Sequence, residues 1–129
     1  MSCTVRTKTR ITDSALLSEA CDRLRDAGVD VQGPRPLNAR MRRVIPATHR
    51  GWVDFDCGEG SSGEARYDSD FRIDADELLS RLQLEYGAAA CAREMDRIGG
   101  SVVSYDLAAD ESYVDLLLDI PEEAILAAG

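Results

Sequence analysis

Alternation of apolar and polar residues at every second position recurs along this chain and constrains its fold more than any other feature. Cys3–Ile11 and Gly51–Cys57 alternate in this way, and so does the stretch from Ala65 to about Ile73. Such alternation predicts strands with one buried face and one solvated face. The glycine- and serine-rich run 58–63 predicts a hairpin loop between the second and third of these strands.

Shorter segments add further strands to this pattern. Val29–Gln32 and Met41–Ile45 are candidates, while Ser101–Leu107 and Ser112–Ile120 predict a closing hairpin. Between the first two, the two prolines that follow Gln32 predict a loop that extends to Ala39.

Two segments have helical spacing instead. Leucines and alanines recur from Leu16 to Ala27, after an N-cap at Thr12 or Asp13. A second helix is predicted to begin at the N-cap Asp74, with Glu77 completing a capping box, and to end at Gly99-Gly100.

The predicted order of elements is β-α-β-(β)-β-β-α-β-β, which indicates an α+β fold. Because most neighbouring strands are joined as hairpins, we expect a mostly antiparallel sheet of about six or seven strands, with the two helices packed on one face. The length of 129 residues fits a single domain, 1–129, in which 121–129 is a short C-terminal tail.

The sequence has no secretory or membrane signature. No apolar stretch approaches the roughly 18 residues that a spanning helix needs. The N-terminus lacks the apolar core of a secretory signal, so we expect a cytoplasmic protein. The four cysteines form no Cys-x-x-Cys pair and His49 is the only histidine, so we expect small buried hydrophobes and no structural zinc site.

Two motifs resemble those of enzymes in lettering alone. The run 58–63 reads G-x-G-x-x-G, but a strand follows it where dinucleotide binding requires a helix N-terminus. His49 has no Gly-x-Ser-x-Gly nucleophile elbow to serve. We therefore expect no cofactor and favour a protein that is not an enzyme.

Arginine is concentrated in one segment of an acidic chain. The net charge is −9, yet the segment from Val31 to Val53 holds five arginines and no acidic residue. A like-signed run of this kind predicts an interaction surface for phosphate, RNA or an acidic protein. The alternative is a solubilising loop. The five candidate partner-binding residues are Arg35, Arg40, Arg42, Arg43 and Arg50.

Carboxylates on the predicted central hairpin suggest a second kind of site. A symmetric loop would place Asp54 opposite Asp68, Trp52 opposite Asp70, and Asp56 opposite Arg66. Opposed carboxylates are unfavourable without a cation, so Asp54, Asp68 and Asp70 are candidate ligands of a hard divalent metal. The alternative is a solvated face that receives counter-charges from the basic residues of the first strand, Arg6, Lys8 and Arg10.

Several short motifs resemble one family across most of the chain. They are Ser2, Lys8-Thr9, Ile11, Asp13, Tyr67 to Phe71, Glu85-Tyr86-Gly87-Ala88 and Gly99-Gly100. The chain resembles the hypothetical chloroplast reading frame 35 family, also called domain-of-unknown-function family 1257. That resemblance carries over no catalytic residue, and it implies an accessory or adaptor role beside an AAA-type ATPase.

The sequence as a whole favours a non-enzymatic accessory or adaptor protein that binds another protein through its charged sheet face or its arginine-rich loop. A protein that binds a small ligand or a divalent cation through the carboxylates is the alternative. A structural subunit of a homo-oligomer is a third possibility. Nucleic acid is disfavoured by the net charge, although the arginine segment leaves it open.

Overall fold

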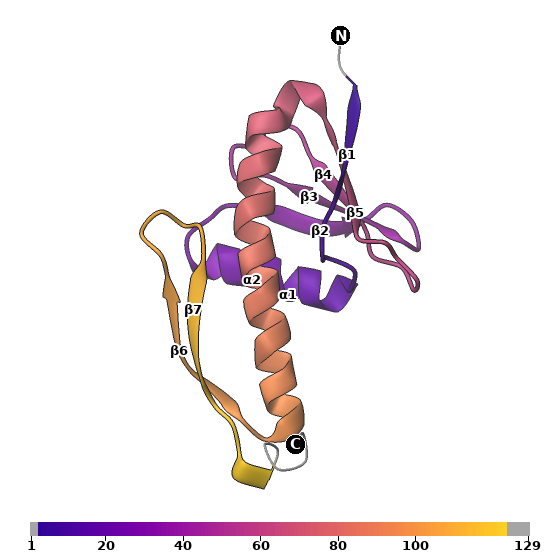
Figure 1. The fold of residues 1–129 in the computed structure, drawn as a ribbon. Coiled ribbons are helices and arrows are strands. Elements are labelled where there is room, and N and C mark those ends of the chain that lie inside the picture. Colours follow the sequence, from indigo (N-terminus) through magenta and orange to yellow (C-terminus); the bar gives the residue numbers. More distant parts are fainter. Residues whose placement is uncertain (1–2, 124–129) are drawn as a thin grey trace. The chain divides into compact units, whose positions relative to one another are not determined.

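The computed structural model describes residues 3–123, and its elements confirm the α+β prediction (Figure 1). Seven strands and two helices follow one another as β-α-β-β-β-β-α-β-β, and all paired strands are antiparallel. The elements are β1 (Thr4–Lys8), α1 (Ser14–Asp26), β2 (Gln32–Pro36), β3 (Met41–Ile45), β4 (Val53–Asp56), β5 (Glu64–Asp68), the single 3₁₀ turn η1 (Ser69–Phe71), α2 (Arg72–Ile98), β6 (Ser101–Leu107) and β7 (Val114–Asp119).

The chain divides into two compact units. The first extends to Tyr86 and the second begins at Gly87, so α2 contributes to both. The expected single domain stays a prediction, because two compact units can fold together or separately. The expected C-terminal tail lies outside the described residues from Ala124 on.

A five-stranded sheet forms the centre of the first unit. Its strand order is β1-β5-β4-β3-β2, so the first strand of the chain pairs with the fifth. β4 lies in the middle, and the loop 57–63 joins it to β5 as a hairpin, as expected. Gly63 in this loop has a positive φ of 77°, and a Cβ there would collide with the carbonyl oxygen of Thr9.

The core of this unit lies between the sheet and its two helices. Val53 and Phe55 on β4 and Ala65 on β5 are fully buried, and Tyr67 on β5 is almost so. The helices contribute further buried side chains, among them Leu16, Leu17, Ala20, Cys21 and Leu24 of α1 and Ala75, Leu78, Leu79 and Leu82 of α2. Both helices therefore cover one face of the sheet, and the opposite face keeps the alternate residues of each strand.

One predicted helix start is confirmed and the other is wrong. The carboxylate of Asp13 accepts the backbone N–H groups of Ala15 (2.8 Å) and Leu16 (3.1 Å), which makes it the N-cap of α1. In contrast, β5 ends at Asp68 and α2 has already begun at Arg72, so Asp74 lies in its first turn. Asp68 instead caps the 3₁₀ turn that precedes α2. Because an aspartate side chain can act as an N-cap at either position, the sequence alone did not distinguish Asp68 from Asp74.

The second unit contains the end of α2 and the hairpin β6–β7. This hairpin was expected, and it forms a separate two-stranded sheet. Its register shifts between Val102 and Ser104, where a bulge places Val103 outside the regular pairing. No strand residue of this hairpin is fully buried.

Candidate functional site

The arginine-rich segment folds as the β2–β3 hairpin: the expected strand Met41–Ile45 is confirmed, whereas residues 33–36, which were expected in a loop, belong to β2. Arg35 lies on β2, Arg42 and Arg43 lie on β3, and Arg40 lies in the turn between the two strands. Arg50 lies beyond the hairpin, in the connection to β4. The prolines of β2 suggested a loop, but β2 is an edge strand, where a residue without an N–H group breaks no ladder.

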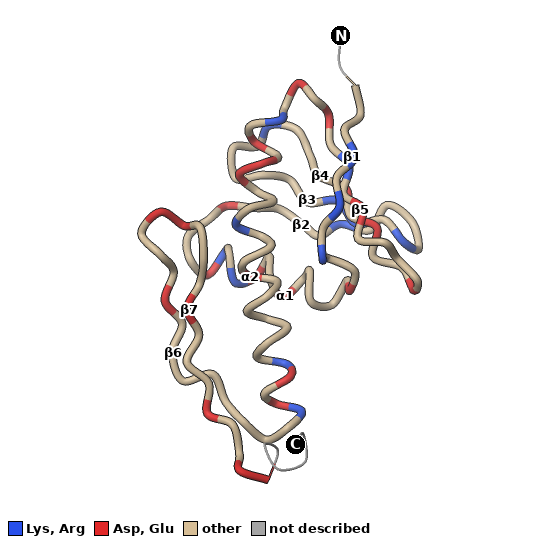
Figure 2. Tube along the Cα trace, in the orientation of Figure 1, with Lys and Arg blue, Asp and Glu red and all other residues tan. Residues whose placement is uncertain are grey.

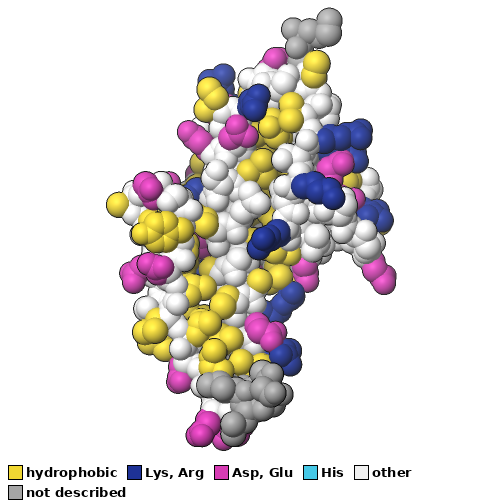
Figure 3. Space-filling view, viewed as in Figure 1, with side chains coloured by type: hydrophobic (Ala, Val, Ile, Leu, Met, Phe, Trp, Pro, Cys, Tyr) yellow, Lys and Arg dark blue, Asp and Glu magenta, His cyan; other side chains and the backbone are white. Residues whose placement is uncertain are grey.

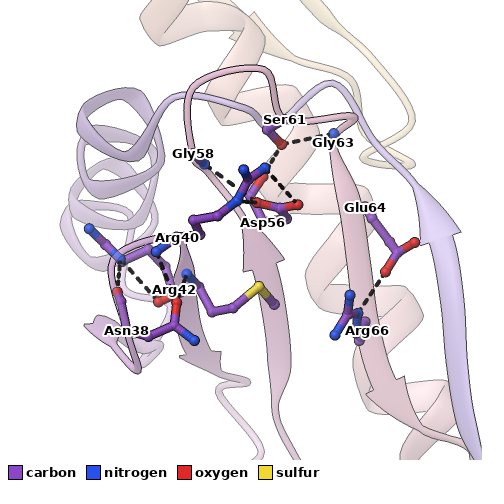
Figure 4. Close-up of polar contacts among 10 residues, drawn as sticks. Asn38, Arg40, Arg42, Asp56, Gly58, Ser61, Gly63, Glu64 and Arg66 are labelled. Atoms are coloured by element: carbon purple, nitrogen blue, oxygen red, sulfur yellow. Dashed lines mark hydrogen bonds and ion pairs between the residues drawn. The ribbon is translucent and has the colours of Figure 1, made fainter.

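Strand register decides which arginines share a face. Arg43 lies directly opposite Asp54 on β4 and Arg35 on β2, so these three side chains share the helix-free face. Arg42 lies opposite the buried Phe55 and therefore belongs to the other face. Its guanidinium donates to the backbone carbonyls of Asn38 (2.8 Å) and Met41 (3.1 Å), so it closes its own hairpin (Figure 4).

The same register continues across the whole sheet. Asp54 on β4 lies opposite Arg66 on β5, and Arg66 lies opposite Arg6 on β1. One line perpendicular to the strands therefore carries a residue from each of the five strands. We call this line the arginine row; its members are Arg6, Arg66, Asp54, Arg43 and Arg35. The row therefore contains four guanidinium groups and one carboxylate, although the net charge of the chain is −9.

The centre of the arginine row is a fixed ion pair. Nε and Nη2 of Arg43 donate to the two carboxylate oxygens of Asp54 at 2.8 and 2.9 Å. Only 8% of Asp54 is exposed, and the hydrogen bond from Arg43 raises the pKa of the guanidinium. The Arg43 guanidinium also lies over the Trp52 ring, 4.5 Å from its centroid. Asp54 is thus already neutralised, and its pairing with Arg43 holds the middle of the row in place.

The two ends of the arginine row are less well compensated. The side chain of Arg6 is 65% exposed, and its Nε lies 4.0 Å from Glu64, which already accepts a hydrogen bond from Arg66 at 2.6 Å (Figure 4). Arg35 is exposed and makes no ion pair with any residue between 3 and 123. It lies opposite Arg43, and two like charges at opposed strand positions are unfavourable unless an anion lies between them.

A second ion pair lies beside the row. Nε and Nη2 of Arg40 donate to Asp56 at 3.1 and 3.3 Å, and this hydrogen bonding lowers the pKa of the Asp56 carboxyl (Figure 4). The hydroxyl of Ser61 donates to the backbone carbonyl of Asp56 and ties the 57–63 loop to the end of β4. Arg40 is therefore paired with Asp56 at the end of β4 and is not a member of the row.

The structure does not bring the three predicted metal ligands together. The expected register was wrong: Asp54 lies opposite Arg66 and not opposite Asp68, because the strands pair two residues out of the symmetric alignment. Asp54 is held by Arg43, while Asp68 accepts the N–H of Asp70 (2.9 Å) as the cap of η1. Between residues 3 and 123, no group of three His, Cys, Asp or Glu side chains is placed to hold a metal ion.

The expectation that the cysteines are buried holds for Cys21, whereas Cys57 and Cys91 are half-buried and Cys3 is exposed. Burial raises the pKa of the Cys21 thiol to about 12 and that of the Cys57 thiol to about 11, which disfavours the nucleophilic thiolate. Nε2 of His49 lies 2.8 Å from Asp30 and its Nδ1 lies 3.3 Å from the amide of Gln32, at an exposed position.

Two members of the arginine row, Arg6 and Arg66, were not among the predicted binding residues. In the sequence they lie 60 residues apart, on strands whose pairing depends on the fold. Both occupy polar positions of strands in which apolar and polar residues alternate, so the sequence could have placed both on the polar face of the sheet. Only the register shows that this polar face aligns them with Asp54 and Arg43.

Comparisons with family models, with curated proteins and with solved structures return no match for this chain. Among the residues described, no helix has the length and apolar character needed to cross a bilayer. The arginine row is the feature of this chain that most resembles a binding surface.

Proposed function

We propose that this chain is a non-enzymatic adaptor protein that binds an acidic segment of a partner protein through the arginine row. The observation that carries the proposal is the alignment of four arginines from four strands with one buried aspartate. Guanidinium groups suit this task because their planar donors match carboxylates in bidentate geometry.

The spacing of the row supports an extended ligand. Neighbouring strands lie about 4.8 Å apart, so the row extends roughly 19 Å from Arg6 to Arg35. Carboxylates on alternate residues of an extended peptide are separated by about 7 Å. Such a peptide has its acidic side chains within reach of the long guanidinium side chains at both ends of the row.

A protein ligand suits the charge distribution better than a nucleic acid does. Blue segments lie on the sheet and on both helices, and red segments are distributed along the whole chain, whose net charge is −9 (Figure 2). A long polyanion is repelled by this net negative charge, while a short acidic segment needs only the arginines of the row. Trp52, the aromatic residue beside the row, already stacks with Arg43, so it is not free to hold a base.

The resemblance to the hypothetical chloroplast reading frame 35 family points to the same class of function. Within this proposal, an AAA-type ATPase is the first partner to look for and the cytoplasm is the compartment in which to look. This step is an analogy, since fold and family likeness do not by themselves specify a binding partner.

Affinity purification from the native host tests the proposal. The tagged wild-type chain is compared with Arg6→Glu/Arg35→Glu, which reverses the ends of the row, and with the control Arg10→Glu/Arg72→Glu. The control has the same change of net charge at exposed positions outside the row. We expect a stoichiometric partner with the wild type and the control and its loss with the row variant. Equal recovery with all three chains contradicts the proposal.

A further inference from the structure

The outer face of the β6–β7 hairpin is both acidic and apolar. Alternation along the two strands leaves Asp106 on β6 and Asp115, Leu117 and Asp119 on β7 exposed. Leu117 is 59% exposed, and Val103 at the bulge is 60% exposed. Hydrophobic side chains gather over this hairpin with acidic side chains among them (Figure 3). A face with this composition is suited to contact another surface.

No basic residue offsets these carboxylates within the hairpin segment. From Gly99 to Glu123 the sequence has seven acidic residues and no lysine or arginine, and the tube is red without blue along both strands (Figure 2). Asp106 lies directly opposite Asp115, an arrangement that is unfavourable without a cation between them. Neither of them, nor Asp119, forms an ion pair with any residue that the structure describes.

The arginine row has the complementary defect. Arg35 lies opposite Arg43, whose charge Asp54 already offsets, so the cations that the row leaves without a close partner are Arg35 and the 65% exposed Arg6 at its ends. The lengths are comparable: Asp115 and Asp119 are separated by about 13 Å along an extended strand, and the ends of the row, Arg6 and Arg35, by roughly 19 Å across four strand spacings, a difference that long arginine side chains can bridge. Each surface therefore carries the charges that the other lacks.

We propose that the outer face of the β6–β7 hairpin of one copy binds the arginine row of a second copy. This inference rests on the proposed function, because it makes the chain's own hairpin one acidic ligand of the row. The two surfaces differ, so the contact is head-to-tail, and it joins copies into a ring or an open chain. An acidic partner competes with the hairpin for the row, so binding of the partner releases the copies from one another.

Sedimentation velocity with reciprocal charge reversal tests this contact. Arg6→Glu/Arg35→Glu reverses the row, and Asp115→Arg/Asp119→Arg reverses the hairpin. At about 0.05 M salt, where screening is weak, we expect the wild type to associate as its concentration rises. Each reversed chain alone is expected to stay monomeric. In the first variant the row and the hairpin are both acidic, and in the second they are both basic, so the two surfaces repel each other.

The mixture of the two reversed chains is the decisive sample. In a 1:1 mixture the native row of one chain meets the native hairpin of the other, and the two reversed surfaces also match. We expect association to return to the wild-type level. The control Glu19→Arg/Glu77→Arg has the same change of net charge on exposed helix positions and is expected to associate like the wild type.

Three outcomes overturn the contact: a wild type that is monomeric at every concentration, a reversed chain that still associates alone, or a mixture that stays monomeric. Titration of the wild type with a hexaglutamate peptide separates this failure from failure of the proposed function. If the chain is monomeric but its row binds the peptide, the proposed function stands and only the self-contact is wrong. If the row does not bind the peptide, both proposals fail.

Discussion

The five-stranded sheet and the β6–β7 hairpin arise from the same alternating pattern, yet they differ in what their apolar residues contact. On β4, Val53 and Phe55 are fully buried beneath the helices. On the hairpin, the apolar face of Val102, Tyr105, Leu107, Val114, Leu116 and Leu118 is only half-buried at every position. Alternation therefore predicts which residues share a face, but the depth of burial depends on how many strands and helices join that face.

The two regions also differ in their charged faces. In the sheet, the strand register places a cation next to each side of Asp54. In the hairpin, the register places Asp106 next to Asp115. Opposite charges at opposed strand positions therefore stabilise the charged face of the sheet, whereas like charges at opposed positions destabilise that of the hairpin unless an external cation binds there.

The largest expected effect separates the two apolar faces. Phe55→Ala removes a fully buried ring from the core of the sheet, and it is expected to lower the free energy of unfolding by about 3–5 kcal/mol. Leu117→Ala removes an apolar side chain that is mostly exposed, so it is expected to change that free energy by at most about 0.5 kcal/mol. Urea unfolding followed by circular dichroism measures both, and similar losses would contradict the contrast.

The next effect compares two ion pairs within the sheet. Asp54→Asn breaks the pair with Arg43, whose side chain is one-third exposed, so we expect a loss of about 1–3 kcal/mol in unfolding free energy. Asp56→Asn breaks the pair with Arg40, whose side chain is half-exposed, so we expect at most about 1 kcal/mol. If the loss for Asp56→Asn is the larger, Asp54 does not anchor the row.

Charge reversal is expected to have a smaller effect on stability, and the sign of this effect should differ between the sheet and the hairpin. Arg66→Asp places a carboxylate opposite Asp54 and is expected to destabilise the sheet by about 0.2–1 kcal/mol. Asp115→Lys places a cation opposite Asp106 and is expected to stabilise the hairpin by a similar amount. Amide hydrogen exchange in β5 and β7 measures each region separately, and a change of the same sign in both would refute the argument.

The smallest expected effect is the pH dependence of the Arg40–Asp56 pair. Because the pKa of Asp56 is lowered in the folded chain, its contribution is present above the unfolded value of about 4 and is lost as the pH falls through the folded pKa. The difference in unfolding free energy between the wild type and Asp56→Asn should therefore be larger at pH 7 than at pH 3. A difference that is independent of pH would show that the ion pair contributes nothing.

Much of the fold could be predicted from the sequence because each strand carries its own local signal. The order of elements, the loop 58–63 and the N-cap Asp13 depend on neighbouring residues alone. Two errors followed from choices between equivalent local signals. Asp68 and Asp74 are both good caps, and the prolines of β2 suit either a loop or an edge strand.

The candidate site was less predictable, because it depends on register. A slip of two residues keeps every side chain on its face, so hydrophobic patterning does not exclude it. That slip replaced the expected opposition of Asp54 and Asp68 with the opposition of Asp54 and Arg66. It changed a predicted metal site into part of an arginine row, and it added Arg6 and Arg66 to the candidate binding residues.

The central claim is that the arginine row binds an acidic segment, and fluorescence anisotropy with a labelled hexaglutamate peptide at low salt tests it most directly. We predict that Arg6→Glu/Arg35→Glu weakens binding by on the order of tenfold or more, because it replaces attraction with repulsion at both ends of the row. Arg10→Glu/Arg72→Glu is predicted to bind within about threefold of the wild type, since it has the same change of net charge but leaves every arginine of the row in place. Equal weakening in the two variants, or no binding to the wild type, would contradict the account.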